Sequence, residues 1–261
     1  MSGAHLRVTN VQQTQAARVA ERFPRFLARF PTAAALADAA AADVLAEWSG
    51  LGYNRRAIAL QRAAAAVAEH GWPRDVAGLE RLPGIGPYTA RAVASLAFGE
   101  PVGVVDTNVR RWLLRRFAGP DQPRLLQQTA DGLASGASTA GEATAWTHAN
   151  MEFGARICTG RSPRCDACPI ADGCPSRGAP APVQVPRQAT FRGSDRAQRG
   201  ALVRALAEAP NHSLSAVGAR TVCADRVAYD RIVAGLERDE LLHRSRGGLR
   251  LGRRSAATIG Q

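Results

Sequence analysis

The sequence predicts an all-α protein that ends in a small basic module. Apolar side chains recur at three- and four-residue steps through residues 11–70, as they do on the buried face of a helix. No alternating pattern typical of a β-hairpin occurs before residue 240. Between residues 175 and 193 the composition changes to Pro, Ala, Gln and Arg, which is typical of an extended linker. These observations predict a helical main portion, a linker and a short C-terminal module.

The helices expected in the main portion are separated by glycine and proline residues. Pro31 opens a second helical segment, which Thr32 can cap. The apolar face of the helix before it consists of Val19, Phe23, Phe26, Leu27 and Phe30. Further helices are expected at residues 43–48, 55–69, 87–98, 107–117 and 142–157.

Beyond the linker, residues 197–209 and 225–238 are expected to form helices. The segment LLHRSRGGLRLG then predicts a hairpin that turns at Gly247 and Gly248. Three helices and a basic hairpin would make a winged-helix module. The alternative is a small helical tail that only packs on the main portion, and the sequence leaves both open.

The charge of the chain indicates a polyanionic partner. The formal net charge is +12, and no lysine occurs, so every positive side chain is an arginine. The isoelectric point is about 11.0, and arginine forms planar, bidentate contacts with phosphate. The alternative is a solvated basic surface on an ordinary enzyme. Without lysine, the protein has no side-chain amine that could form a Schiff base.

Four of the five cysteines lie within one short run, with the spacing C-x6-C-x2-C-x5-C. The first residues, MSGAHLRVTN, lack the apolar stretch of a signal peptide. We therefore expect a cytoplasmic protein with reduced thiols, which favours a metal centre over a disulfide pair. Only one pair is as tight as a zinc knuckle, so an iron–sulfur cluster is preferred to zinc. The run consists of Cys158, Cys165, Cys168 and Cys174, and Cys223 is expected to be a separate buried residue.

Two further segments indicate contact with a nucleic acid. In LPGIGPYTARAV, the glycines of a tight turn permit positive φ and leave backbone N–H groups able to bind one phosphate, although the turn can also be a simple connector. In VVDTNVRRW, Asp106 precedes a helix, where a cap for that helix is the structural alternative to a reactive carboxylate.

Together these segments resemble the helix–hairpin–helix (HhH-GPD) DNA glycosylase superfamily, and within it the MutY-type adenine DNA glycosylases. The resemblance covers roughly residues 7–175 and rests on five blocks in order: VQQTQAARV, LAEWSGLGYNRRA, LPGIGPYTARAV, VVDTNVRR and MEFGARICTGRSPRCDACPIADGC. Endonuclease III enzymes carry a lysine where this chain has Tyr88. The resemblance therefore implies a monofunctional glycosylase that contains a 4Fe-4S cluster.

The resemblance also implies a domain organisation. A six-helix module with the helix–hairpin–helix turn would span residues 6–108. The cluster subdomain would combine residues 1–5 with 109–175. A Pro-rich linker at 176–196, the winged-helix-like module at 197–253 and a tail at 254–261 would follow.

The roles of individual residues are implied in the same way. Asp106 matches the catalytic aspartate, which stabilises the oxocarbenium character of the sugar, and Asn108 and Tyr88 match residues beside it. Tyr53 matches an aromatic wedge that fills the space left by an extruded base, although it can also be a half-buried core aromatic. The remaining DNA-binding matches are Gln12, Gln13, Thr14, Arg55, Leu82, Gly84 and Gly86, and the four cysteines match the cluster ligands.

One position departs from the family pattern. Four residues before Gln12, where the family has the glutamate that protonates the departing adenine, this chain has Val8. Loss of a general acid typically costs about 10²- to 10⁴-fold in rate. We expect a base excision repair enzyme that acts as a monomer on duplex DNA at the nucleoid, removing adenine opposite 8-oxoguanine or guanine. Two alternatives remain: removal of another base, such as an alkylated purine that leaves without protonation, and a non-catalytic lesion-binding protein.

Overall fold

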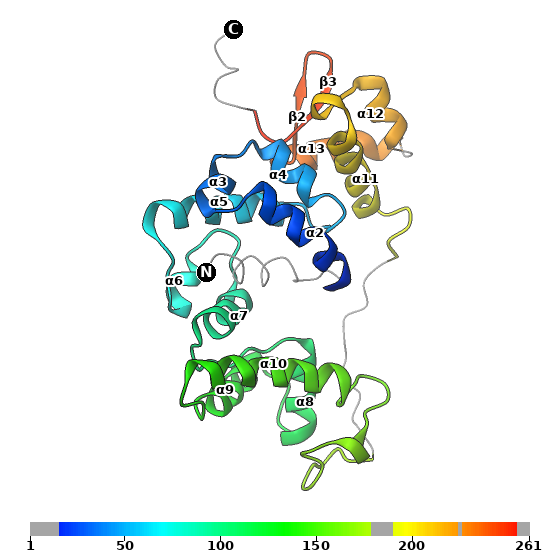
Figure 1. The fold of residues 1–261 in the computed structure, drawn as a ribbon. Coiled ribbons are helices and arrows are strands. Elements are labelled where there is room, and N and C mark those ends of the chain that lie inside the picture. Colours follow the sequence, from blue (N-terminus) through cyan, green and yellow to red (C-terminus); the bar gives the residue numbers. More distant parts are fainter. Residues whose placement is uncertain (1–15, 179–189, 224–225, 255–261) are drawn as a thin grey trace. The chain divides into compact units, whose positions relative to one another are not determined.

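The computed structural model describes residues 16–178, 190–223 and 226–254 (Figure 1). This part of the chain divides into two compact units. The first unit contains residues 16–71, residues 82–84 and the described residues from 190 onward. The second unit contains residues 72–81 and 85–178. The described helices include none that is both long and apolar enough to cross a membrane.

The N-terminal helices of the first unit confirm the predicted apolar face. Val19, Phe23, Phe26 and Phe30 are buried. Thr32 caps the next helix, because its hydroxyl accepts a hydrogen bond of 3.0 Å from the N–H of Ala35. These helices are α2 (Ala16–Arg29), α3 (Ala33–Asp38), α4 (Ala41–Trp48) and α5 (Arg55–His70).

The C-terminal part of the first unit has a winged-helix architecture. Strand β3 is the centre of a three-stranded antiparallel sheet with the order β1-β3-β2. Gly248 approaches the neighbouring strand so closely that a Cβ there would collide with the carbonyl oxygen of Leu214. The elements are α11 (Asp195–Glu208), η2 (Pro210–His212), β1 (Ser213–Ser215), α12 (Ala216–Val222), α13 (Arg226–Arg238), β2 (Leu242–Ser245) and β3 (Gly248–Leu251).

This C-terminal module shares one hydrophobic core with helices α2–α5. Leu202, Leu206, Ile232 and Leu236 are fully buried in the same cluster as Trp48. Two ion pairs also join the module to helix α5: Arg55 with Asp239 at 3.5 Å and Arg62 with Glu240 at 2.5 Å. The first compact unit therefore joins, through one buried core, segments that are far apart in the sequence.

The second unit is helical. Helix α10 begins with a capping box, in which the side chain of Thr139 accepts from the N–H of Glu142 and the Glu142 carboxylate accepts from the Thr139 N–H. A second core gathers Val109, Trp112, Leu113 and Leu126. The elements are α6 (Val76–Glu80), α7 (Pro87–Phe98), α8 (Thr107–Phe117), α9 (Pro123–Ala134), α10 (Ala140–Arg156) and η1 (Cys165–Ala167).

Candidate functional site

Asp106 lies at the N-terminus of helix α8, where both of its carboxylate oxygens accept hydrogen bonds. Oδ1 accepts from the N–H of Val109 at 2.6 Å, so Asp106 is the cap of this helix. Oδ2 accepts from the side-chain amide of Asn108 at 3.1 Å. The side chain is half-buried. Asp106 therefore caps helix α8, as the structural alternative predicted. The contact with Asn108 adds a second restraint on the carboxylate.

Tyr88 lies in the first turn of helix α7, and its ring is 36% exposed. Partial burial raises the pKa of the Tyr88 hydroxyl, and the negative charge of Asp106 raises it further. The hydroxyl therefore stays protonated at neutral pH and can donate a hydrogen bond. The second unit thus joins Asp106 to Asn108 by a hydrogen bond and places Tyr88 near enough for its hydroxyl to be affected by the Asp106 charge.

Arg111 connects this group to the cysteine loop. Its Nη2 donates to Oδ1 of Asn108 at 3.0 Å and to the carbonyl oxygen of Gly154. Its Nε donates to the carbonyl oxygen of Cys158 at 2.8 Å. Burial lowers the pKa of Arg111, while the negative charges of Cys158 and Asp106 act in the opposite direction. The link requires glycine at position 154, because a Cβ there would lie 2.6 Å from the Asn108 carbonyl oxygen.

One turn further along helix α8, Arg115 supports the cysteine loop directly. Its Nη1 lies 3.5 Å from Sγ of Cys158 and donates to the Thr159 carbonyl oxygen at 2.7 Å. Its Nη2 donates to the Gly160 carbonyl oxygen at 3.0 Å. The sequence reasoning missed both Arg111 and Arg115. The available signal was the spacing of Asn108, Arg111 and Arg115 at three- and four-residue steps, which places them on one face of helix α8.

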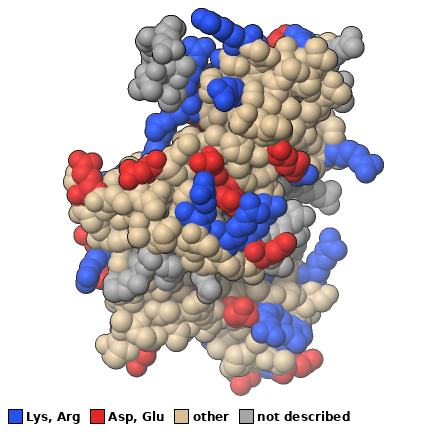
Figure 2. Space-filling model, turned by 45° about the horizontal axis from the view of Figure 1, so that its top comes forward, with Lys and Arg blue, Asp and Glu red and all other residues tan. Residues whose placement is uncertain are grey.

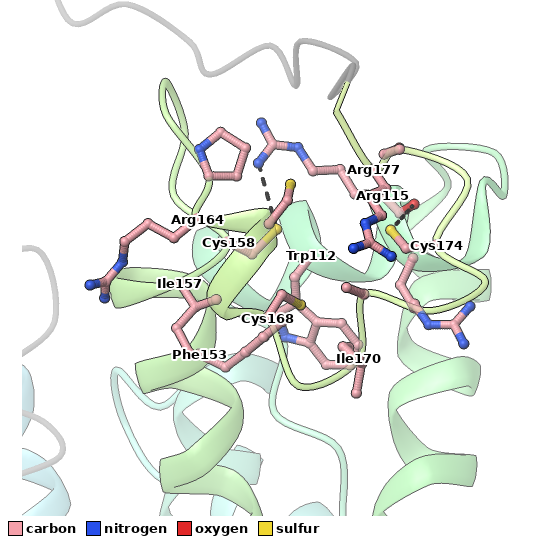
Figure 3. A pocket seen from close by; sticks show the side chains of 15 residues that line it. Trp112, Arg115, Phe153, Ile157, Cys158, Arg164, Cys168, Ile170, Cys174 and Arg177 are labelled. Carbon is pink, nitrogen blue, oxygen red and sulfur yellow. Dashed lines mark hydrogen bonds between the residues drawn. The ribbon is translucent and has the colours of Figure 1, made fainter.

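The four cysteines of the run line one pocket of the second unit (Figure 3). All four thiols are half-buried and none forms a disulfide. Apolar walls reduce solvent access, and arginines can balance the charge of four thiolates. Figure 3 shows the labelled cysteines arranged around the pocket, with the rings of Trp112 and Phe153 beside it. The other lining residues include Arg115, Arg116, Ile157, Pro163, Arg164, Ile170 and Arg177.

This arrangement fits a polynuclear centre. In the described part of the chain, no three His, Cys, Asp or Glu side chains converge as closely as one metal ion requires. In a 4Fe-4S cluster each thiolate binds a different iron, so the four sulfurs stand further apart than the ligands of a single ion. Four half-buried thiols around one largely apolar pocket can supply one ligand to each iron.

Tyr53 lies in the first unit, in the loop between helices α4 and α5. Its backbone is left-handed, with φ of +48°, and its ring is 43% exposed, more than is usual for a core aromatic. The guanidinium of Arg56 lies 5.7 Å from the Tyr53 ring centroid and 5.4 Å from that of Trp48. Burial lowers the pKa of Arg56, and the Tyr53 hydroxyl acts in the opposite direction. The Arg56 guanidinium therefore packs against the exposed ring of Tyr53 and links it to the buried ring of Trp48.

Arg55 begins helix α5, and its side chain is 76% exposed. Its guanidinium forms the ion pair with Asp239 described above, so part of its charge is already balanced. The exposure leaves room for a phosphate contact.

The helix–hairpin–helix turn was predicted only in part. Gly84 has φ of +75°, and a Cβ there would collide with that of Ala59 on helix α5, so glycine is required. Gly86 does not need the conformational freedom of glycine, because its φ is −93° and a Cβ there would meet no described atom within 4 Å; its contact with DNA stays a prediction. Leu82 is 8% exposed, which leaves its backbone, not its side chain, to contact DNA. The N-cap of helix α7 is Gly86, which has no side chain to cap the helix.

Four positions of interest, Val8, Gln12, Gln13 and Thr14, lie outside the described residues. Their roles stay predictions.

Comparison with known proteins identifies the family. The model of the "HhH-GPD superfamily base excision DNA repair protein" matches residues 9–134. The adenine DNA glycosylase of Mycobacterium tuberculosis is 40% identical over 249 residues, which cover 91% of this chain and 81% of that enzyme. The corresponding enzyme of Mycolicibacterium smegmatis is 38% identical over 91% of this chain and 83% of its own length. The chain belongs to the adenine DNA glycosylase family.

The alignments with these relatives differ in extent. Since the mycobacterial alignments cover 91% of this chain, they reach into the C-terminal module. The human adenine DNA glycosylase is 40% identical over 173 residues, which cover 64% of this chain and 32% of the human protein. The similarity to the human enzyme thus covers a smaller part of this chain than the similarity to the mycobacterial enzymes.

Two further comparisons agree with this family membership. The model for the iron–sulfur binding domain of endonuclease III matches residues 158–174, which confirms the 4Fe-4S cofactor predicted for the cysteine run. A thermostable thymine-DNA glycosylase has a similar fold, with a TM-score of 0.60 and 25% identity over 66% of this chain and 82% of that one. An endonuclease III bound to DNA follows, with a TM-score of 0.57 and 26% identity over 66% and 81% of the two chains.

Proposed function

We propose that this member of the adenine DNA glycosylase family hydrolyses the bond between adenine and deoxyribose in duplex DNA, where the adenine faces 8-oxoguanine or guanine. The observation that carries the proposal is the group formed by Asp106, Asn108 and Tyr88. Its support is the similarity to adenine DNA glycosylases over 91% of the chain.

In the proposed reaction, Asp106 stabilises the positive charge that develops on the sugar as the base departs. A carboxylate fixed in advance loses little free energy to reorganisation when that charge appears. The hydrogen bonds from Val109 and Asn108 restrict its two oxygens. The Tyr88 hydroxyl, kept protonated, supplies a donor to orient the sugar or the attacking water. The cluster is structural in this scheme and is held by Cys158, Cys165, Cys168 and Cys174.

We further propose that the protein is monofunctional. Strand cleavage by a glycosylase requires an amine that attacks the sugar, and this sequence contains no lysine. Tyr88 occupies the position at which the resemblance to endonuclease III would require one. Hydrolysis by water then leaves an abasic site with an intact strand.

Val8 favours a second candidate function. Adenine is a poor leaving group unless it is protonated, and valine cannot donate a proton. A cationic alkylated purine leaves without protonation, so it would need Asp106 but no general acid. A protein that binds lesions without excising a base would need neither Asp106 nor a general acid for chemistry.

Single-turnover cleavage of labelled duplexes tests these proposals. The substrates carry adenine opposite 8-oxoguanine, adenine opposite guanine, or an alkylated purine. We expect abasic sites with the first two, and loss of product in Asp106→Asn. Asp121→Asn is the matched control, because it removes the same charge from an exposed residue that pairs with Arg110. Excision of the alkylated purine alone would show that the substrate is an alkylated purine and not mispaired adenine. If the protein binds the duplexes tightly, yields no abasic product and binds equally well as Asp106→Asn, the proposal that it is an enzyme is refuted.

We also propose that the protein acts as a monomer on the DNA of the nucleoid. The net charge of +12 supports association with a polyanion of this kind. Sedimentation with a duplex that carries one lesion tests the monomer, since a single protein chain per duplex is expected.

A further inference from the structure

The hairpin formed by β2 and β3, with the residues that follow it, is the most basic part of the C-terminal module. Residues 244–254 include five arginines and no acidic residue. The apolar side chains of β3 point into the core, where Leu249 and Leu251 are buried, whereas Arg250 between them is exposed. The arginines are Arg244, Arg246, Arg250, Arg253 and Arg254.

Many other arginines of the first unit have acidic partners. Arg25 pairs with Glu47 at 2.8 Å, and Arg231 pairs with Asp195 at 2.9 Å. Figure 2 shows blue and red side chains lying beside one another over the middle of the face that it presents. A paired arginine attracts a phosphate less strongly than an unpaired one, because the nearby carboxylate offsets its charge.

Three arginines of the hairpin region differ from this pattern. Arg246, Arg250 and Arg253 are exposed, and they form no ion pair with any residue that the structure describes. By contrast, Arg244 lies 3.2 Å from a Glu237 carboxylate oxygen. The side chain of Arg254 donates to the Arg244 carbonyl oxygen at 3.1 Å, which fixes the end of β3 beside β2.

Helix α13, which occupies the position of a recognition helix, is less suited to a polyanion. Its exposed face carries Val227, 88% exposed, together with Asp230 and Ala234. Among the side chains that the structure describes on this helix, only Arg238 in its last turn adds an exposed positive charge without an ion pair. Arg231 on the same helix is held by Asp195. A helix that reads base edges in the major groove needs polar side chains able to donate to or accept from the bases. The positive charge of the module is concentrated on the hairpin.

We propose that Arg246, Arg250 and Arg253 bind the phosphate backbone of duplex DNA without regard to its sequence. The proposal rests on the proposed function only for the identity of the ligand. Arg246 lies in the turn and Arg250 on β3, so they are less than about 13 Å apart, the length of four fully extended residues. B-DNA carries a negative charge for every ~1.7 Å of its axis, so arginines spaced within this limit can each reach a separate phosphate.

The hairpin is rigidly attached to the loop that carries Tyr53. The module and helices α4 and α5 share one core, and Asp239 pairs with Arg55 two residues after Tyr53. At the end of β3, a Cβ at Gly252 would lie 3.0 Å from the backbone nitrogen of Ala42 on helix α4. DNA bound by the hairpin is therefore held in a fixed relation to Tyr53 within the first unit.

The test is the salt dependence of binding to an undamaged duplex. The variant R246Q/R250Q/R253Q is compared with R25Q/R62Q/R231Q, which removes the same net charge from ion-paired arginines. Each lost phosphate contact lowers the slope of log K against log salt by about 0.9. Between 50 and 200 mM salt, the affinity of the wild-type protein should therefore fall ~40-fold more than that of the hairpin variant.

The control variant should keep the wild-type slope, and each single hairpin substitution should lower it by about 0.9. Equal Tm values confirm that the variants are folded. An unchanged slope in the hairpin variant, or an equal loss in the control, would overturn the inference. These results are distinct from failure of the proposed function, which would appear as a wild-type protein that binds undamaged duplex but excises no base.

Discussion

Asn108 is predicted to contribute to the reaction by holding the Asp106 carboxylate, and Asn108→Ala tests this contribution. The substitution removes the 3.1 Å hydrogen bond to Oδ2 of Asp106 and leaves the 2.6 Å bond from the N–H of Val109. Arg111 loses one acceptor but keeps the carbonyl oxygens of Gly154 and Cys158. The carboxylate would thus retain one of its two restraints, and the link to the cysteine loop would persist.

The size of the effect follows from the charge of the acceptor. A hydrogen bond to a charged group contributes about 1.5–3 kcal/mol, and every ~1.4 kcal/mol corresponds to a factor of ten in rate. We therefore expect the single-turnover excision rate of Asn108→Ala to fall about ten- to 150-fold. The substrate is a duplex with adenine opposite 8-oxoguanine, and Tm is measured alongside to confirm the fold.

The matched control for this substitution is Asn150→Ala. Asn150 lies on helix α10 and donates 2.7 Å to the Trp146 carbonyl oxygen, within its own helix. The control rate should stay within about twofold of the wild-type rate, because Asn150 has no hydrogen bond to Asp106 or Arg111 among the described residues. If the rate of Asn108→Ala also stays within twofold, the proposed role of Asn108 is wrong.

Three further predictions follow from the remaining contacts. Because its pKa is raised in the folded state, Tyr88 stabilises the fold below its ordinary pKa of 10.0 and loses this contribution as the pH rises through the folded value. The Tm of the wild-type protein should consequently fall more steeply above pH 10 than that of Tyr88→Phe, and parallel curves would refute this. Arg56→Ala should lower the free energy of unfolding by about 1–3 kcal/mol, because two cation–π contacts are lost. Arg55→Ala removes only an exposed ion pair and should cost less than ~1 kcal/mol. Denaturant titration compares the two variants, and equal losses would contradict the stabilising role of the cation–π contacts. The purified protein should be brown and contain about four irons per chain. Iron should be lost from Cys168→Ser but retained in Cys223→Ser, because the buried thiol of Cys223 lies outside the cysteine run and donates to Gln198. A colourless wild-type protein with one zinc per chain would refute the cluster.

The sequence predicted those features that depend on local spacing. The apolar face of helix α2, the cap at Thr32 and the hairpin of β2 and β3 each depend on residues within a few positions of one another. The cysteine run was interpreted from its spacing and from the lack of a signal-peptide pattern in the first residues. The group of Asp106, Asn108 and Tyr88 came from the family resemblance, and the structure brings its members together.

The features that the sequence did not predict depend on distant partners or on short elements. Nothing in the periodicity of helix α11 or α13 reveals that Leu202 and Ile232 pack in one core with Trp48. Strand β1 has three residues, too few to show alternation. The φ of Gly86 depends on how the turn closes, and glycine permits either sign. Arg111 appeared to be one arginine among many, because its acceptor at Cys158 lies 47 residues away.

The central claim is that the Asp106 carboxylate stabilises positive charge on the sugar. The most direct measurement compares the affinity for two duplexes that differ at one nucleotide: one carries a cationic amine in place of the deoxyribose ring, and the other carries a neutral abasic analogue. The wild-type protein should prefer the cationic duplex, by about 10²-fold or more if it acts as a transition-state mimic, and Asp106→Asn should abolish that preference while binding the neutral duplex normally. A preference for the cation that survives in Asp106→Asn would contradict the claim.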